Sequence, residues 1–301
     1  MTLPHAVVHE LAVKPGEGAG LTQRSTSATH ADWLGPMGHA HPKDVAERDL
    51  EAFKQELLGA QELLYASDRW ALLVVFQALD AGGKDGTIKH VMAGVDPQGC
   101  VVVSFKQPSA LELRHDFLWR CVAQLPARGR IGIFNRSYYE DVLVVRVHEE
   151  LAANRPAGAA RGADMWRERF EDINAFERHL VRNGTKVLKL FLHVSAAEQR
   201  RRLLERLDEP GKRWKSSPTD IAEHGRFAEY QHAYEAAITA TSTPWAPWYV
   251  VPADHKYAMR ALVGGIVVHA IDGLDLSLPQ PDAARLKVIE AAAAALRAEE
   301  Q

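Results

Sequence analysis

The chain has 301 residues, of which 47% are hydrophobic and 25% charged, so it can bury a substantial core in one large domain or two small ones. The formal net charge of −3 gives no overall attraction to nucleic acid or membranes, and any polyanion site must come from local clustering of basic residues. Two cysteines are too few for a disulfide framework, and neither a leader-like N-terminus nor an eighteen-residue apolar run occurs. We expect a cytoplasmic protein without nucleic-acid or membrane partners.

The N-terminal residues 1–43 mix glycine, proline, serine, threonine and histidine without a sustained period. We expect them to form an arm that lies over the surface or is partly disordered. From Pro42 to Tyr65, apolar residues recur at helical spacing and predict an amphipathic helix. The main domain should therefore cover residues 44–301.

Five short apolar runs predict strands that are buried on both faces, as in parallel sheets. Helix-like stretches lie between them, and strands that alternate with helices are typical of α/β proteins. We predict a doubly wound, three-layer α/β/α sandwich with about five parallel strands. The expected strands cover residues 70–76, 101–105, 130–134, 185–193 and 248–251, and the expected helices cover 87–93, 109–124, 137–146, 163–183, 195–207, 218–241, 255–272 and 282–299.

A glycine-rich segment, QALDAGGKDGT, directly follows the first expected strand and runs from Gln77 to Thr87. A strand, a glycine-rich turn and a helix start in this order can bind phosphate, because backbone N–H groups and the helix dipole face the anion. The match to the usual pattern is incomplete, since Ala78 replaces its first glycine and Asp85 its hydroxyl residue. A plain turn with an exposed lysine is the alternative. The expected phosphate contacts are Gly82, Gly83, Lys84, Asp85, Gly86 and Thr87.

Acidic residues accompany this loop and the end of the third expected strand. Asp80 lies within the loop, where a carboxylate could hold Mg²⁺ or orient the reacting phosphate, or could only satisfy a turn. The segment NRSYYED after residue 134 should face the loop, since ligands gather at the carboxyl ends of strands in such sheets. There Arg136 could contact phosphate, and Glu140 and Asp141 could serve a nucleotide or a metal.

Basic residues concentrate between Arg200 and Lys215, where seven of them stand against three acidic residues. A row of lysines and arginines attracts a polyanion and gains entropy from counterion release. A solvated helix face is the alternative for such a run. Pro210 and Gly211 should break the helix into a lid-like loop. Lys106, with Arg114 and Arg120 beyond it, could extend a positive wall.

Four motifs carry a resemblance to a known family. They are LDAGGKDGTIKHV, SFKQPSALELRHDFLWR, IGIFNRSYYEDVLVVRVH and LDEPGKRWKSSPTD, and together they span Leu79 to Asp220. The chain resembles the second family of polyphosphate kinases from about Asp44 to Asp272. The resemblance implies a P-loop kinase fold with a helical lid near residues 200–220, and direct in-line phosphoryl transfer between inorganic polyphosphate and the nucleotides AMP, ADP and ATP. It also implies Mg²⁺, with Mn²⁺ as the alternative, and a homo-oligomer, either dimer or tetramer.

The same resemblance implies roles for individual residues. Asn135 stands where some family members keep an aspartate, which leaves Asp80 and Asp141 as the expected metal ligands. The Tyr-Glu-Asp-Val segment is similar to the subgroup that phosphorylates both nucleoside monophosphates and diphosphates, with Glu140 as its marker. The catalytic set would be Asp80, Lys84, Arg136, Glu140 and Asp141, and the polyphosphate contacts outside the loop would be Lys106, Arg136, Arg202, Lys212, Arg213 and Lys215.

Two other functions compete with this hypothesis. An ATP-dependent nucleoside monophosphate kinase would share the loop, the sheet and an arginine-bearing lid, but it would need only one compact donor site. A non-catalytic protein that binds polyanions or nucleotides would keep positive charge without needing Asp80, Lys84 and Asp141 together. The sequence leaves the physiological direction, the base preference and the preferred chain length of polyphosphate open.

Overall fold

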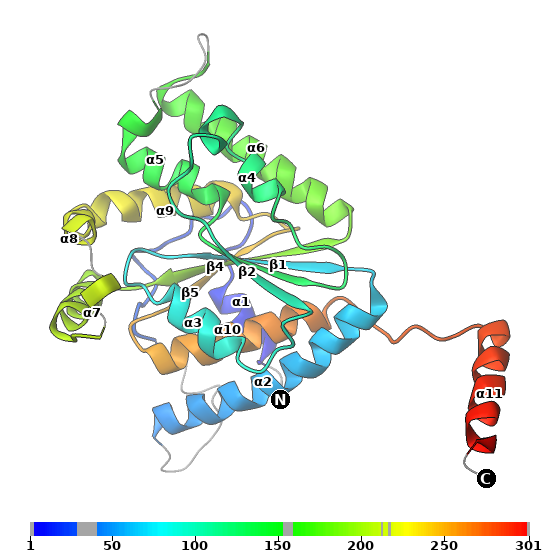
Figure 1. Cartoon of the computed structure of the whole chain (residues 1–301). Coiled ribbons are helices and arrows are strands. Elements are labelled where there is room, and N and C mark those ends of the chain that lie inside the picture. Colours follow the sequence, from blue (N-terminus) through cyan, green and yellow to red (C-terminus); the bar gives the residue numbers. More distant parts are fainter. Residues whose placement is uncertain (1–2, 29–40, 153–158, 212, 216–217, 300–301) are drawn as a thin grey trace.

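A single parallel sheet organises the molecule (Figure 1). The computed structural model describes residues 3–28, 41–152, 159–211, 213–215 and 218–299. All neighbouring strands pair in parallel, in the order β2-β3-β1-β4-β5. The strands are β1 Ala71–Gln77, β2 Cys100–Ser104, β3 Ile131–Asn135, β4 Thr185–His193 and β5 Trp248–Pro252. The five predicted strands are thus confirmed to within one residue at each end.

Helices cover both faces of the sheet, as the predicted α/β/α sandwich requires (Figure 1). One layer contains α1 His5–Leu11, α2 Pro42–Ser67, α3 Lys84–Val91 and α10 Lys256–Asp272. The other contains α4 Trp119–Val122, α5 Val144–Val147, α6 Gly162–Arg182 and α9 Phe227–Thr241. Two further helices, α7 Ala196–Asp208 and α8 Pro218–Gly225, lie beside the sheet, and α11 Ala283–Ala298 extends away from the body with no buried residue. No helix in the described ranges combines the length and apolar character that a membrane span needs.

Strand β1 shows why a continuous apolar run predicts a central strand. All seven of its residues are buried. Because side chains alternate across a strand, Leu72 and Val74 belong to one hydrophobic cluster, whereas Leu73 and Val75 belong to the cluster on the opposite face. Burial on both faces fixes the carboxyl end of β1 and therefore the loop that follows it.

Three expected helices are interrupted. Residues 109–124 form only the short 3-10 helix Glu112–Arg114 and α4, because the Asp116 carboxylate accepts the backbone N–H of Leu118 and competes with helical bonding. Residues 137–146 divide into the 3-10 helix Tyr138–Val142 (η2) and α5. The long helix expected after Pro218 is two helices, α8 and α9, that part at Gly225 and Arg226.

The N-terminal segment is part of the core rather than a surface arm. Leu3, Val7, Val8 and Leu11 are buried in the same cluster as α2 and α10. The chain then bonds to β5, where the backbone N–H of Val13 donates to Trp248 O at 2.8 Å. The sequence-based expectation of a surface arm does not describe residues 3–28, because their short apolar stretches give no sustained period. Residues 1–2 and 29–40 of this segment lie outside the described ranges.

The close packing of the N-terminal segment on α10 yields a stability prediction. A Cβ on Gly265 would lie 2.9 Å from Leu3 Cβ and 3.1 Å from Phe53 Cζ, whereas a Cβ on Gly264 would meet no atom closer than 3.4 Å. Both Gly→Ala changes gain the same helix propensity. We expect Gly265→Ala to have a free energy of unfolding about 1–3 kcal/mol below that of Gly264→Ala, as chemical denaturation would measure. Equal stabilities would contradict this packing.

Candidate active site

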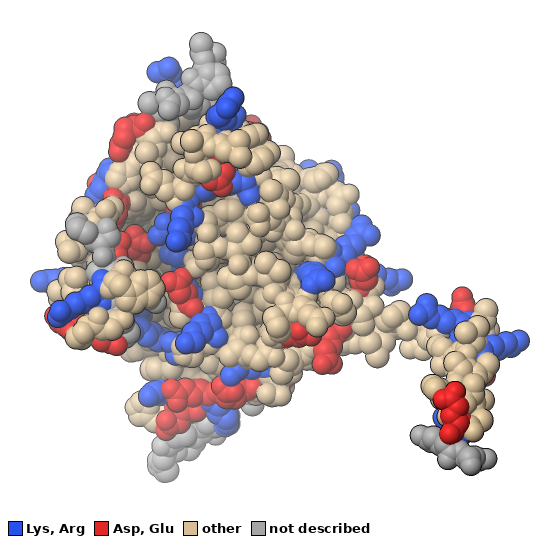
Figure 2. Space-filling model, viewed as in Figure 1, with Lys and Arg blue, Asp and Glu red and all other residues tan. Residues whose placement is uncertain are grey.

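The polar residues singled out in the sequence gather where β1 and β3 end. This edge faces α7 and α8, and in Figure 2 basic and acidic side chains alternate on that side of the molecule. The centre of the same view, over β2 and α4, is largely uncharged. The β2 residues Val101 and Val102 are exposed. Ligands of open α/β sheets bind at the carboxyl ends of strands, so this edge is the candidate active site.

The segment after β1 is a tight turn that opens directly into α3. A Cβ on Gly82 would lie 2.8 Å from both Ala78 Cβ and Leu79 O, so only glycine fits there. Ala81 and Gly83 have positive φ angles of 57° and 107°. Gly83 provides no side-chain cap, and the first N–H groups of a helix have no intrahelical partner. These N–H groups can therefore bind an anion, and the segment has the geometry of a phosphate-binding loop.

Lys84 is held against its own loop. Its side chain is buried, and Nζ donates to Ala78 O at 2.6 Å and lies 3.4 Å from Leu79 O. Burial lowers the pKa of the ammonium below its usual value, and the charge of Arg136 lowers it further. An ammonium has three N–H donors, so one donor remains for a phosphate oxygen. The hydroxyl and the backbone N–H of Thr87 both donate to Gly83 O at 2.9 Å, so neither donor is free for the predicted phosphate contact.

Arg136 joins the two strand ends. Its Nη2 donates to Asp80 Oδ1 at 2.7 Å, and its Nη1 lies 3.9 Å from Glu140 Oε2. The residue has a φ of 65°, which is strained for a side chain with a Cβ, and its backbone N–H is held by Phe76 O. Such strain is common at functional sites. Gln199 of α7 fixes the loop from the other side by donating to Asp80 O at 2.9 Å.

The structure separates the two neighbouring acids Glu140 and Asp141. Glu140 faces the loop: burial raises its pKa, and Arg136 and Lys84 oppose that rise. Asp141 faces away: burial raises its pKa to about 6, and the opposing charges come from Arg169 and Arg120. The predicted metal pair of Asp80 and Asp141 is therefore not supported, because successive residues of η2 point to different sides. Glu140 is the carboxylate that stands next to Asp80.

The carboxylates near the loop fit Mg²⁺ bound together with substrate phosphates. In the described ranges, no three His, Cys, Asp or Glu side chains are arranged as an all-protein metal site. Mg²⁺ needs only one or two carboxylates when phosphates and water complete its shell. The pair with Arg136 uses one oxygen of Asp80, and the exposed Asp85 accepts the Asn135 amide at 2.6 Å. Each carboxylate thus keeps a second oxygen that can accept a ligand.

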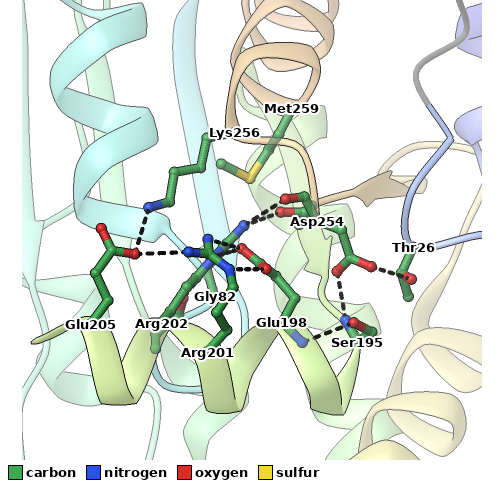
Figure 3. A network of polar contacts seen from close by, with 12 residues as sticks. Thr26, Gly82, Ser195, Glu198, Arg201, Arg202, Glu205, Asp254, Lys256 and Met259 are labelled. Atoms are coloured by element: carbon green, nitrogen blue, oxygen red, sulfur yellow. Dashed lines mark hydrogen bonds and ion pairs between the residues drawn. The ribbon is translucent and has the colours of Figure 1, made fainter.

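Arg202 clamps the loop instead of lining an open groove (Figure 3). The residue is buried, and its Nη1 donates to Gly82 O at 3.0 Å while Nη2 contacts Ala253 O and Asp254 O. Its Nε donates to Glu198 at 2.7 Å. These acceptors occupy the guanidinium on every side, so the predicted direct contact of Arg202 with polyphosphate is not met in this structure. The sequence correctly predicted that Arg202 lies on a helix over residues 195–207. It did not indicate that the side chain points into the protein, toward the loop.

The remaining predicted polyphosphate contacts are dispersed. Arg213 is exposed, and its Nε donates to Leu207 O at 2.7 Å, which closes the end of α7. Lys106 is exposed just after β2. Lys215 belongs to the 3-10 turn Arg213–Lys215, but its side chain lies outside the described part of the chain, as does Lys212. The structure therefore tests neither of those two lysines.

A buried network behind the site was missed in the sequence. Lys189 and Glu177 are fully buried and lie 2.6 Å apart, and the hydroxyls of Tyr138 and Tyr139 donate to Glu177 Oε1 at 3.0 and 2.9 Å. The two tyrosines directly precede Glu140, so this network fixes the turn that carries the acid. A lysine inside the apolar run VLKLFLH was the available signal, since a lysine is rarely buried without a partner.

The position of Asp141 predicts a pH-dependent stability. Its pKa is about 6 in the folded chain against 3.8 as the ordinary value, so the charged form costs stability above about pH 6 and the cost fades as the pH falls toward 4. Asp141→Asn should raise the free energy of unfolding by about 1–3 kcal/mol at pH 8 and by much less at pH 4.5. Denaturation at both pH values would measure this. Exposed Asp116→Asn is the control, and a pH-independent effect of Asp141→Asn would contradict the prediction.

Comparisons with known proteins agree on one family. The sequence model of polyphosphate kinase 2 matches residues 40–278. An ADP-polyphosphate phosphotransferase of Rhodopseudomonas palustris is 49% identical over 235 residues, which are 77% of this chain and 81% of the relative. An AMP/ADP-polyphosphate phosphotransferase of Meiothermus ruber is 47% identical over 247 residues, which are 82% of this chain and 89% of the relative.

A solved structure agrees with the sequence comparisons. The crystal structure of polyphosphate kinase 2 from Arthrobacter aurescens matches with a TM-score of 0.83 and 36% identity, and the match covers 96% of this chain and 98% of that one. The range matched by the family model contains the loop after β1, the end of β3 and α7. The chain belongs to the polyphosphate kinase 2 family.

Proposed function

We propose that the chain is a polyphosphate-dependent nucleotide kinase that transfers phosphoryl groups from inorganic polyphosphate to AMP and to ADP, reversibly and by direct in-line transfer. One observation carries the proposal: in a member of this family, Lys84, Asp80, Arg136 and Glu140 meet at the loop between β1 and α3. The names of the relatives from Rhodopseudomonas palustris and Meiothermus ruber support the donor and the two acceptors.

The residues of the loop would act by positioning and by charge neutralisation. The free N–H groups at the start of α3 and the remaining donor of Lys84 would bind oxygens of the terminal polyphosphate unit. An oxygen of the nucleotide's terminal phosphate then forms a bond to the terminal phosphorus, and the bond from that phosphorus to the chain oxygen breaks. The nucleotide gains one phosphate, and the polyphosphate leaves one unit shorter. The attacking oxygen is already anionic, so no strong base is needed.

Arg136 and Glu140 would divide the remaining work. Arg136 lies between Asp80 and Glu140 and can offset the negative charge that develops on the transferring group. Glu140 holds Arg136 from the side of η2, where a nucleoside monophosphate would be positioned. Mg²⁺, which we propose as cofactor with Mn²⁺ as the alternative, would neutralise charge between phosphates when bound, with Asp80 and Asp85 as the ligands that fit it.

An ATP-dependent nucleoside monophosphate kinase is the competing function, because it needs the same loop. Two parallel reactions of the purified protein with Mg²⁺ separate the functions: one contains long-chain polyphosphate with either AMP or ADP, and the other contains ATP and AMP without polyphosphate. The products of both are followed by chromatography. Phosphorylation of both nucleotides supports the proposal. Phosphorylation of a monophosphate by ATP, without any turnover of polyphosphate, would support the competing function. A homo-oligomer, a cytoplasmic location and the absence of a nucleic-acid partner stay predictions.

Lys84 provides the direct test of the loop. Lys84→Met keeps the apolar part of the side chain but removes the ammonium that offsets phosphate charge. We expect kcat/KM for ADP phosphorylation to fall about 10²-fold or more, the usual size for a lost charge-stabilising donor. The matched control is Lys89→Met, on the exposed last turn of the same helix, which should retain activity. Full activity in Lys84→Met would remove the loop from the mechanism.

Glu140 provides the test of acceptor choice. Glu140→Asn removes the carboxylate that faces Arg136 and Lys84, and we expect it to depress AMP phosphorylation about tenfold more than ADP phosphorylation, a difference of about 1.4 kcal/mol. Steady-state kinetics with each nucleotide would measure the ratio. Asp141→Asn is the control, since that carboxylate faces away from the loop. Equal losses with AMP and ADP would count against a role for Glu140 in positioning the monophosphate.

A further inference from the structure

Arg260 is a cation beside the loop, and the described part of the chain gives it no hydrogen-bond acceptor. It lies on the second turn of α10, and its Nη2 would be 3.8 Å from a Cβ built on Gly86, in the first turn of α3. Its Nε is buried and has no hydrogen-bond partner among the described residues. The guanidinium of Arg202, by contrast, donates all of its hydrogen bonds to carbonyl and carboxylate acceptors of the protein. Arg260 therefore has donors available for a ligand.

The surroundings of Arg260 would favour an anion. The positive end of a helix dipole repels a cation, and α3 begins at Lys84, two residues before Gly86. Burial lowers the pKa of the Arg260 guanidinium, Glu47 opposes that change and Arg202 adds to it. A buried guanidinium donor without an acceptor costs free energy, and a bound anion would remove that cost. Gly86 has no side chain to fill the space between α3 and this guanidinium.

Lys256 adds a second cation on the same side of α10. It precedes Arg260 by four residues, so both side chains lie on one face of the helix. Its Nζ is 3.9 Å from Glu205, too far for a hydrogen bond (Figure 3). Burial lowers its pKa, and Arg202 and Arg201 lower it further against the influence of Glu205. Two partly buried cations therefore lie on α10: Arg260 beside the first turn of α3, and Lys256 at the start of α10.

We propose that Arg260 and Lys256 form a subsite for a phosphate unit of polyphosphate that lies beyond the unit held by the loop. The donor chain would then run from Gly83 and Lys84, past Gly86, to the start of α10. This inference rests on the proposed function and names a path for its donor that the sequence did not predict. A chain long enough to reach α10 gains charge-assisted hydrogen bonds that a short chain cannot make.

The test compares donors of different length. Arg260→Met and Lys256→Met are assayed with saturating ADP and either long-chain polyphosphate or the shortest chain that the wild-type protein uses. We expect each change to raise the KM for long chains about tenfold and to change the KM for the shortest chain less than about twofold, with the KM for ADP unchanged. Arg260→Lys keeps the charge and should restore most of the affinity for long chains.

The controls separate this inference from other failures. Lys89→Met removes an exposed cation from the last turn of α3, and it should change the KM of neither the long nor the short polyphosphate. The denaturation midpoint of each variant shows whether it folds. If Arg260→Met does not fold, Arg260→Lys and Lys256→Met still test the subsite. Equal effects on long and short chains, or no effect on either, would overturn the subsite. Failure of the wild-type protein to use any polyphosphate would instead overturn the proposed function.

Discussion

The ion pair between Lys189 and Glu177 is the interaction on which the active site depends most. Both groups are fully buried, and taking two such charges out of water costs several kcal/mol per ion unless hydrogen bonds satisfy them. Thr241 O accepts from Lys189 at 2.7 Å, and the hydroxyls of Tyr138 and Tyr139 complete the shell of Glu177. This network therefore joins strand β4, helix α6 and the turn before Glu140.

The phosphate-binding loop is held by β3 on one side and by α7 on the other. From β3, Arg136 binds Asp80 at the cost of a strained backbone. From α7, Gln199 and Arg202 bind carbonyls of the loop, and Arg202 also binds the backbone between β5 and α10. A loop fixed in this way keeps its N–H groups oriented before any substrate arrives, so little reorganisation is needed during transfer. The first half of α7, which was predicted as part of a lid, is therefore bonded to the body of the protein.

The sequence predicted what depends on local pattern. The five strands, the order of strand, loop and helix around Lys84, and the segment that carries Arg136 follow from apolar runs and from glycine and charge spacing. The direction of single side chains depends on tertiary neighbours and was not predictable. Arg202 turns inward to Glu198 and to four backbone carbonyls, and Asp141 turns away from the loop that Glu140 faces. The N-terminal segment was missed because Leu3 and Val13 reach the core singly, without a period.

That segment also has a consequence for handling the protein. β5 is an edge strand, and unpaired strand edges are templates for association between chains. Here the bridge between Ala12 and Tyr249, with the bond from Val13 to Trp248, occupies part of the outer edge of β5. A version trimmed to the residues that the family shares would keep every group at the phosphate-binding loop yet uncover this edge. It would also uncover the part of the core that Leu3, Val7, Val8 and Leu11 cover. Its defect would be lower stability and edge-to-edge association between chains, not the loss of a group at the loop.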